Sequence, residues 1–303
     1  MIEVPDDLVV SLGAHGGAAG RVFAAGLPGL AGRFLEEWGL RLDGAAMSGV
    51  CALVLPVVRV ADGRRAALKL QMVDEETVGE PVALRVWGAA GAGVVGLLAH
   101  DAASGVMLLE RLDERRPLTG VEDVRVAVRV LAESLARLVG VPAPPGMRRL
   151  GDAAARMLAE APGTAGGLAD ADERRLLRDC AAAVREVAGE PGDRLLHWDL
   201  HFGNVLAGCR EEGRAGEWVV LDPKPLGGDP GFELFPALHN RFDASEVLWR
   251  FDLLSGVLEL DRERARAWTL GRVLQNGLWG IRGGARRLPA DHAEIARLLL
   301  GRD

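Results

Sequence analysis

Cysteine is scarce in this sequence of 303 residues. The three cysteines, Cys51, Cys180 and Cys209, are odd in number and show no C-x-x-C spacing. This pattern argues against both a disulfide framework and a structural zinc site. We therefore expect reduced thiols that lie mostly in the core.

Long hydrophobic runs are also missing. The longest strongly apolar stretch, residues 50–58, contains Pro56 and is about half as long as a membrane span. The N-terminal residues Met-Ile-Glu-Val-Pro-Asp-Asp are acidic, whereas a signal peptide begins with basic residues. The sequence accordingly predicts no membrane contact and a cytoplasmic location.

An excess of positive charge is the third absence. Lysine and arginine number 36 against 43 acidic residues, so the formal net charge is −7. The long-range field of such a chain repels polyanions, and we expect no nucleic-acid partner. With 49% hydrophobic and 26% charged residues, the composition is that of a soluble globular protein and excludes disorder.

Hydrophobic spacing divides the chain into a β-rich part and an α-rich part. Between residues 50 and 71, a β-branched run, an Asp-Gly turn and a second apolar run predict a β-hairpin. Helical spacing predicts helices at residues 20–38, 77–87, 121–139, 151–160, 170–188, 243–258, 262–278 and 290–300. We expect an N-terminal lobe at 1–112 and a larger lobe at 113–303.

The segment from His197 to Asn204 contains the pattern H-x-D-x-x-x-x-N, which is typical of a kinase catalytic loop. A carboxylate must orient the attacking hydroxyl in such a reaction, and Asp199 is the candidate. An apolar run at 218–221 then ends on Asp222. Amide and carboxylate oxygens are hard ligands for Mg²⁺, so Asn204 and Asp222 are candidate metal ligands.

Phosphoryl transfer also needs positive charge on the nucleotide phosphates. Lys69 lies in the second strand of the predicted hairpin, and Glu80 follows eleven residues later near a helix start. This spacing fits an ion pair between a strand lysine and a helix glutamate. The linker at 108–112 includes Glu110 and Leu112, and its backbone groups are candidates for binding adenine.

These motifs together resemble the aminoglycoside phosphotransferase family, most closely its streptomycin 6-phosphotransferase or hydroxyurea phosphotransferase branch. The resemblance is carried by residues 38–40, 67–69, Glu80 with 83–87, 108–112, 197–204, 221–225 and 228–230. It implies an α+β, protein-kinase-like two-lobe fold, with an N-terminal antiparallel β lobe that carries a helix and a larger, mostly α-helical C-terminal lobe.

The resemblance implies ATP- and Mg²⁺-dependent phosphorylation of a small-molecule hydroxyl. The expected substrate is a cationic aminocyclitol antibiotic such as streptomycin, which would make the protein an antibiotic-resistance enzyme. By the same resemblance Asp199 is the catalytic residue and Asn204 and Asp222 are the metal ligands. Lys69 contacts the phosphates, and Glu80 braces Lys69.

Two segments depart from the pattern of protein kinases. The nucleotide-binding loop at 42–50 lacks G-x-G-x-x-G, so phosphate contacts are expected from the backbone of residues 45–48 and the hydroxyl of Ser48. The magnesium motif reads Asp222-Pro223-Lys224 instead of Asp-Phe-Gly. We therefore expect a constitutively assembled site, in which Lys224 adds positive charge near the transferred phosphoryl group.

Acidic residues are frequent near the predicted active site. Between Asp229 and Glu263 there are eight acidic residues and three arginines. They can be solvated helix faces, or some can bind a cationic substrate by charge complementarity. The candidates for substrate binding are Asp229, Glu233, Asp243 and Glu246. The resemblance also gives Asp229 the task of holding the catalytic loop through backbone hydrogen bonds.

Other functions remain open. The substrate can be a sugar, an amino alcohol or hydroxyurea, or the protein can be a nucleotide-binding regulator without catalysis. His197 and Asp199 with His201 or His239 can also form a metal cluster of the oxygenase type, although this leaves Lys69 unexplained. The acceptor hydroxyl, the choice between ATP and GTP and the oligomeric state are not determined by the sequence.

Overall fold

The computed structural model describes residues 2–209 and 213–301. It divides into two compact units, Met1–Arg115 with Ala207–Val219, and Arg116–Leu206 with Val220–Asp303. The first unit therefore includes residues 207–219, which the sequence analysis placed in the second lobe. The boundaries between the units fall within three strands, β7 (Leu112–Pro117), β9 (Val205–Gly208) and β10 (Trp218–Val220). These strands pair in the order β10-β9-β7. Local spacing does not reveal such pairing, because the partners are far apart in sequence.

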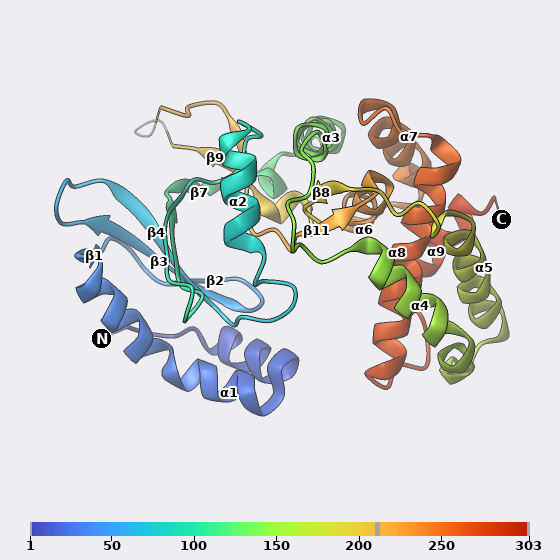
Figure 1. Ribbon diagram of the computed structural model, residues 1–303, viewed down its shortest axis with the longest axis horizontal. Helices are drawn as coiled ribbons and strands as arrows, with labels where there is room; N and C mark the ends of the chain where they lie inside the picture. Colours follow the sequence, from blue (N-terminus) through green and yellow to red (C-terminus); the bar gives the residue numbers. More distant parts are fainter. Residues whose placement is uncertain (1, 210–212, 302–303) are drawn as a thin grey trace. The chain divides into compact units, whose positions relative to one another are not determined.

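An antiparallel sheet forms the centre of the first unit (Figure 1). Its strand order is β1-β3-β4-β6-β5, and a short strand β2 pairs with β3. The strands are β1 (Leu40–Leu42), β2 (Met47–Ser48), β3 (Ala52–Arg59), β4 (Arg65–Gln71), β5 (Leu97–His100) and β6 (Met107–Glu110). The hairpin expected at 50–71 is β3 and β4, in which Val54 lies opposite Lys69. Helix α2 (Glu80–Ala89) begins three residues later than the spacing predicted.

The first helix, α1 (Asp6–Glu37), is longer than the helix expected at 20–38. It bends at Gly17, whose φ of 57° lies outside the helical region. A glycine adopts this conformation readily because it has no Cβ. Both parts of α1 contribute to one core with the sheet, formed by Leu8, Leu12, Leu27, Phe34, Leu53, Leu55, Val57, Leu68 and Leu70 among others.

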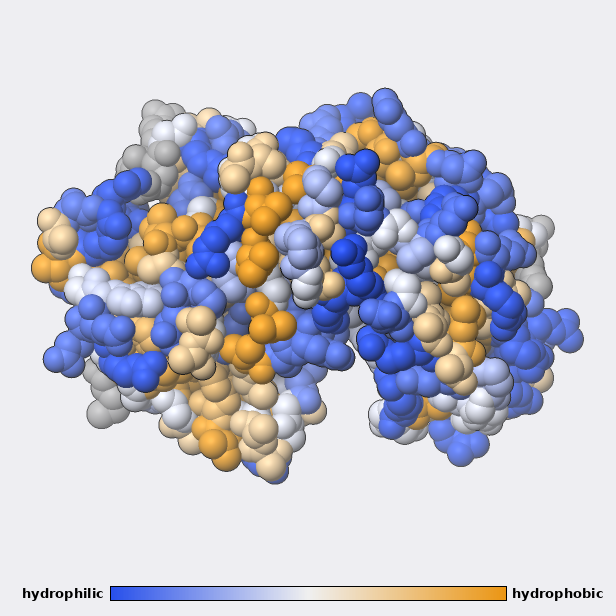
Figure 2. Space-filling model, in the orientation of Figure 1, coloured by the Kyte–Doolittle hydropathy of each residue, from blue (hydrophilic) through white to orange (hydrophobic). Residues whose placement is uncertain are grey.

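By length and composition alone, α1 is the one helix in the described residues that could cross a membrane. Its most apolar window has a mean hydropathy of 1.2, and 22% of that window is buried. Hydrophobic residues appear over the part of the surface formed by α1 (Figure 2), where Val10 and Val22 are exposed. Core helices of soluble proteins pass the same test, and the inner face of α1 lies in the core described above.

The second unit consists mainly of helices. They are α3 (Val124–Val139), α4 (Leu150–Thr164), α5 (Ala171–Val187), α6 (Phe235–His239), α7 (Val247–Val257), α8 (Arg262–Arg282) and α9 (Ala290–Leu299). Short 3₁₀ turns lie at Leu118–Gly120, Ala165–Gly167, Phe202–Asn204, Pro230–Glu233 and Ala244–Glu246. In helix α8 the side chains of Trp268, Leu270 and Val273 are fully buried.

The predicted helix at 243–258 is interrupted near its start. Asp243 accepts hydrogen bonds from the backbone N–H and the hydroxyl of Ser245 and begins a 3₁₀ turn, after which α7 starts at Val247. The cysteines form no disulfide among the described residues. Cys180 is buried, but Cys51 and Cys209 are half-buried, so fewer thiols lie in the core than the sequence analysis expected.

Candidate active site

A two-stranded sheet holds the predicted catalytic loop in the second unit. The loop follows β8 (Arg194–Leu196), and the segment 222–225 precedes β11 (Leu226–Gly228). The two strands are antiparallel, with Leu196 opposite Leu226. The N–H of Lys224 donates to the carbonyl of His197 at 2.9 Å. The two segments that the sequence analysis selected therefore run side by side.

His197 is buried and shapes this loop. Its Nε2 lies 3.0 Å from the carbonyl oxygen of Leu221, and its Nδ1 accepts the backbone N–H of Asp199 at 3.3 Å. These contacts require a neutral ring with the proton on Nε2. Burial lowers the pKa of His197 to about 4, which agrees with this tautomer. Both ring nitrogens of His197 thus contact backbone groups, one of them the N–H of Asp199.

Asp199 follows a residue in an unusual conformation. Trp198 has a φ of 66°, in the left-handed region that residues other than glycine seldom adopt. The amide nitrogen of Asn204 donates to the backbone oxygen of Asp199 at 2.9 Å. Burial is the main cause that raises the pKa of the Asp199 carboxyl. When ionised, this group is a stronger proton acceptor than an exposed aspartate.

The candidate magnesium ligands come from two neighbouring segments. The N–H of Leu221 donates to the carbonyl of Asn204 at 3.0 Å, so Asp222 comes next to the Asn204 backbone. Because the side-chain nitrogen of Asn204 donates to Asp199, its Oδ1 is the remaining metal-binding atom. An amide oxygen and a carboxylate form a donor set that suits Mg²⁺. Lys224 Nζ lies 3.6 Å from the Asp222 carboxylate.

Glu233 occupies a different position from the one predicted for it. It is fully buried, and its Oε1 accepts the backbone N–H of Trp198 at 2.8 Å. Burial raises the pKa of Glu233 to about 7. A carboxyl group enclosed in this way has no surface for a solvated substrate. Glu233 instead supports the backbone of the catalytic loop directly before Asp199.

Asp229 was expected to perform that supporting task and also to contact the substrate. In the structure it is buried and caps the 3₁₀ turn that leads to Glu233, where it accepts the N–H of Gly231 at 2.8 Å. Its other oxygen accepts from Arg264 at 2.5 Å. Sequence reasoning misplaced the two roles, because the turn between Asp229 and Glu233 decides which carboxylate reaches the loop.

Asp243 and Glu246 line an open hollow of about 520 Å³. Asp243 is engaged in its capping bonds to Ser245, and Glu246 lies 3.3 Å from Arg125. The other residues around this hollow are Asp123, Val124, Arg241, Phe242 and Arg250. Three acidic side chains thus face three arginines, so the hollow does not carry a strong negative charge.

The first unit holds the predicted ion pair. Lys69 Nζ lies 2.7 and 2.8 Å from the two carboxylate oxygens of Glu80, and all three groups are buried. Gln71 also donates to Glu80, at 2.6 Å. Sequence reasoning missed Gln71. Residues two apart on a strand share a face, so its position two residues after Lys69 was the available signal.

The remaining predicted nucleotide contacts have other partners. The Ser48 hydroxyl lies 3.3 Å from the Asp7 carboxylate of α1. Glu110 accepts the N–H of Gly96 at 2.9 Å and pairs with Arg214 at 3.0 Å. Only backbone atoms near Glu110 and Leu112 thus remain as candidates for adenine binding.

The oxygenase-type alternative is wrong in its choice of residues. His197 directs its ring nitrogens at backbone groups. Among the described residues, the group of His, Cys, Asp and Glu side chains that could hold a metal consists of His239, Asp291 and His292. His239 therefore lies with residues of α9, and its partners could not be identified from sequence spacing.

A family model for aminoglycoside/hydroxyurea antibiotic resistance kinases matches residues 37–284. The chain belongs to this family. It is 62% identical to a hydroxyurea phosphotransferase of Kitasatospora aureofaciens, over 100% of this chain and 87% of the relative. It is 51% identical to a streptomycin 6-kinase of Streptomyces glaucescens, over 99% and 98% of the two chains. These findings confirm the predicted family and the prediction of a small-molecule phosphotransferase.

The fold is also that of solved phosphotransferases. A mutant of the aminoglycoside phosphotransferase APH(4)-Ia, crystallised with ADP and hygromycin B, superposes with a TM-score of 0.62 over 89% of this chain and 97% of that chain. The sequence identity is 14%, so this likeness concerns the fold. The predicted protein-kinase-like α+β fold is confirmed.

Proposed function

We propose that the protein transfers the γ-phosphoryl group of ATP to a hydroxyl of a small molecule, with hydroxyurea as the preferred acceptor. The arrangement of Asp199, Asn204 and Asp222 on the frame of β8 and β11 is the observation that supports phosphoryl transfer most strongly. Relatives named as phosphotransferases for hydroxyurea and for streptomycin supply the choice of acceptors.

In the proposed mechanism, the acceptor hydroxyl donates a hydrogen bond to the Asp199 carboxylate. Its oxygen attacks the γ-phosphorus in line, so a new O–P bond forms while the bond to the leaving ADP oxygen breaks. The proton of the hydroxyl passes to Asp199. Its raised pKa favours this step, because the carboxylate accepts a proton more readily.

The other residues of the site position charge. Lys69, held by Glu80, would contact the nucleotide phosphates. Mg²⁺ bound by Asn204 and Asp222 would neutralise negative charge on the phosphates. We assign adenine binding to the backbone near Glu110 and Leu112 in the predicted N-terminal lobe, residues 1–112. Ser48 stays a candidate for phosphate contact through its loop backbone, and the protein is proposed to work in the cytoplasm.

Hydroxyurea is preferred over streptomycin for two reasons. Identity to the hydroxyurea phosphotransferase is higher, 62% against 51%. In addition, the acidic residues expected to bind a cationic aminocyclitol are engaged within the protein. Glu233 and Asp229 are buried, and Asp243 and Glu246 have the partners described above. A small neutral acceptor needs no such carboxylates. Streptomycin is the second candidate because of the 51% identical relative.

The test is a coupled assay of ADP release with ATP, Mg²⁺ and either hydroxyurea or streptomycin. We expect turnover with a higher kcat/KM for hydroxyurea, and loss of turnover in Asp199→Ala with nucleotide binding retained. Asp252→Asn, an exposed residue paired with Arg262, is the matched control and should keep full activity. Wild-type turnover by Asp199→Ala would overturn the mechanism, and a higher kcat/KM for streptomycin would reverse the preference.

A further inference from the structure

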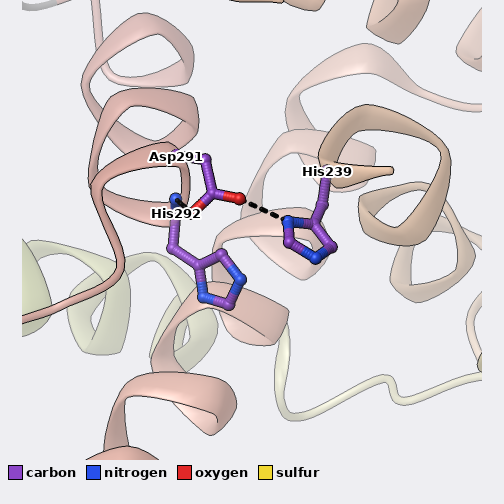
Figure 3. A group of neighbouring side chains, drawn as sticks. All are labelled: His239, Asp291 and His292. Carbon is purple, nitrogen blue, oxygen red and sulfur yellow. Dashed lines mark hydrogen bonds and ion pairs between the residues drawn. The ribbon is translucent and has the colours of Figure 1, made fainter. Parts of the chain in front are cut away.

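A second group of chemically active side chains lies in the second unit, outside the catalytic loop. His239 is at the end of α6, and Asp291 and His292 are in the first turn of α9. In Figure 3 the three side chains point toward one another. Their possible ligand atoms all lie within 4.8 Å of one another. The proposed reaction uses none of these residues.

His292 carries the strongest sign of a missing partner. The residue is 9% exposed, and its Nδ1 has no hydrogen-bond partner in the described part of the chain. Leaving such an atom unsatisfied destabilises the folded protein. Imidazole nitrogens are common ligands of transition-metal ions. A neutral imidazole is the form that binds metal ions.

The neighbouring groups hold the cluster in place. One oxygen of Asp291 accepts the backbone N–H of His292 at 2.9 Å, and the other lies 2.6 Å from Nδ1 of His239. Phe235 stacks on the His239 ring and meets the His292 ring edge-on, with centroid distances of 5.6 and 4.9 Å. The buried His292 ring therefore has a restricted orientation, which lowers the entropy lost on binding a ligand.

We propose that His239, Asp291 and His292 bind one divalent transition-metal ion of the zinc type, which joins the end of α6 to the start of α9. Two imidazoles and one carboxylate are ligands that Zn²⁺ accepts, with water completing the coordination. Mg²⁺ prefers oxygen ligands, so this site is chemically distinct from the one at Asn204 and Asp222.

The site can adjust to the ion and is open to solvent. Zinc bonds of about 2.0–2.2 Å bring ligand atoms closer together than 4.8 Å, so at least one side chain must rotate inward. His239 is the residue that can do so, because 43% of its side chain is exposed. Asp291 is 24% exposed. An ion can thus enter from this side, while His292 binds it from within.

Zinc binding to the full-length protein tests the proposal. Chelator-treated protein is titrated with Zn²⁺ in excess Mg²⁺ by calorimetry, and its melting temperature is measured with and without Zn²⁺. We expect one zinc ion per chain and a higher melting temperature when it is bound. His239→Gln should weaken binding at least about tenfold. Asp291→Asn should also weaken zinc binding, and it tests the site if His239→Gln does not fold.

His15→Gln is the matched control. His15 is an exposed histidine of α1 whose ring contacts Ser11, and its loss should leave zinc affinity unchanged. Co²⁺ in place of Zn²⁺ gives a spectroscopic readout, since its visible absorption reports nitrogen and oxygen ligation. The proposal is overturned if the wild type binds no zinc, or if His239→Gln and Asp291→Asn, folded as judged by metal-free melting, bind it as tightly as the wild type.

Discussion

The carboxyl group of Glu233 faces the backbone of the catalytic loop and not the solvent. One of its oxygens accepts the Trp198 N–H, while the other has no hydrogen-bond partner in the described residues. Burial without full hydrogen bonding favours the protonated form, which explains why its pKa rises from 4.5 to about 7. Near neutral pH this residue therefore changes its protonation state, at a point where it contacts the backbone of the residue before Asp199.

This shift makes stability depend on pH. The folded protein holds a proton on Glu233 at pH values where the unfolded chain has lost it. The stabilisation is therefore fully present below the unfolded pKa of 4.5 and is lost as pH rises through about 7. Relative to Glu233→Gln, which keeps the oxygen acceptor but does not titrate, the wild-type melting temperature should fall between these pH values. If the melting temperatures of the two proteins depend on pH in the same way across this range, the assignment is wrong.

Lysine occurs only twice in the sequence, at Lys69 and Lys224, and the other basic residues are arginines. Lys69 fills a buried slot in which its compact ammonium group contacts both oxygens of Glu80. A planar guanidinium is larger and has its donors in a fixed fork. Arginine thus keeps the charge but does not fit the slot.

Lys69→Arg should therefore lower kcat/KM by about 10²-fold, the order found when one electrostatic donor is removed from an active site. Steady-state kinetics with varied ATP measures the loss. Arg65→Lys, an exposed exchange on the same strand, is the control and should be neutral. Normal activity in Lys69→Arg would show that charge alone suffices at this position.

At the scale of elements, the pairing of β11 with β8 decides the geometry of the site. Gly228 in β11 lies against α4, and a Cβ atom placed on it would come within 2.5 Å of the Leu150 Cβ. This close packing holds the strand between α4 and the catalytic loop. Close packing thus explains why glycine stands at position 228, the first residue of the Gly-Asp-Pro run.

Gly228→Ala should destabilise the protein by about 1–3 kcal/mol, because the core must move to admit the methyl group. Chemical denaturation measures the change. Gly256→Ala in α7 is a matched control, since nothing lies within 4 Å of the added Cβ, and it should be neutral or slightly stabilising. Equal stability of the two variants would show that β11 has room to shift.

At the scale of the whole molecule, a nucleotide that binds only the folded chain must stabilise it. ATP with Mg²⁺ at one hundred times its Kd should add about 2.7 kcal/mol to the free energy of unfolding. Asp222→Asn should reduce this gain by weakening the metal site, while Asp252→Asn should not. Thermal melting with ATP and either Mg²⁺ or a chelator separates the two contributions. An unchanged gain in Asp222→Asn would remove Asp222 from the metal site.

The sequence by itself determined those features that depend on neighbouring residues. Alternating and helical hydrophobic spacing placed the β3–β4 hairpin and most helices of the second unit, because the period of the pattern reflects local geometry. The catalytic-loop motif placed Asp199 and Asn204 in one segment, since their spacing is short. The pair of Lys69 and Glu80 was also accessible, because a strand followed closely by a helix brings them together.

Only the tertiary structure decided the features that depend on distant contacts. It placed Glu233, and not Asp229, under the catalytic loop. It showed that residues 207–219 belong to the first unit. It also placed His239 next to Asp291 and His292 of α9. In each case the interacting groups are separated by many residues, or by a turn whose exit direction local spacing does not define. Packing of the complete chain determines these contacts, because side-chain type alone does not specify which distant residues meet.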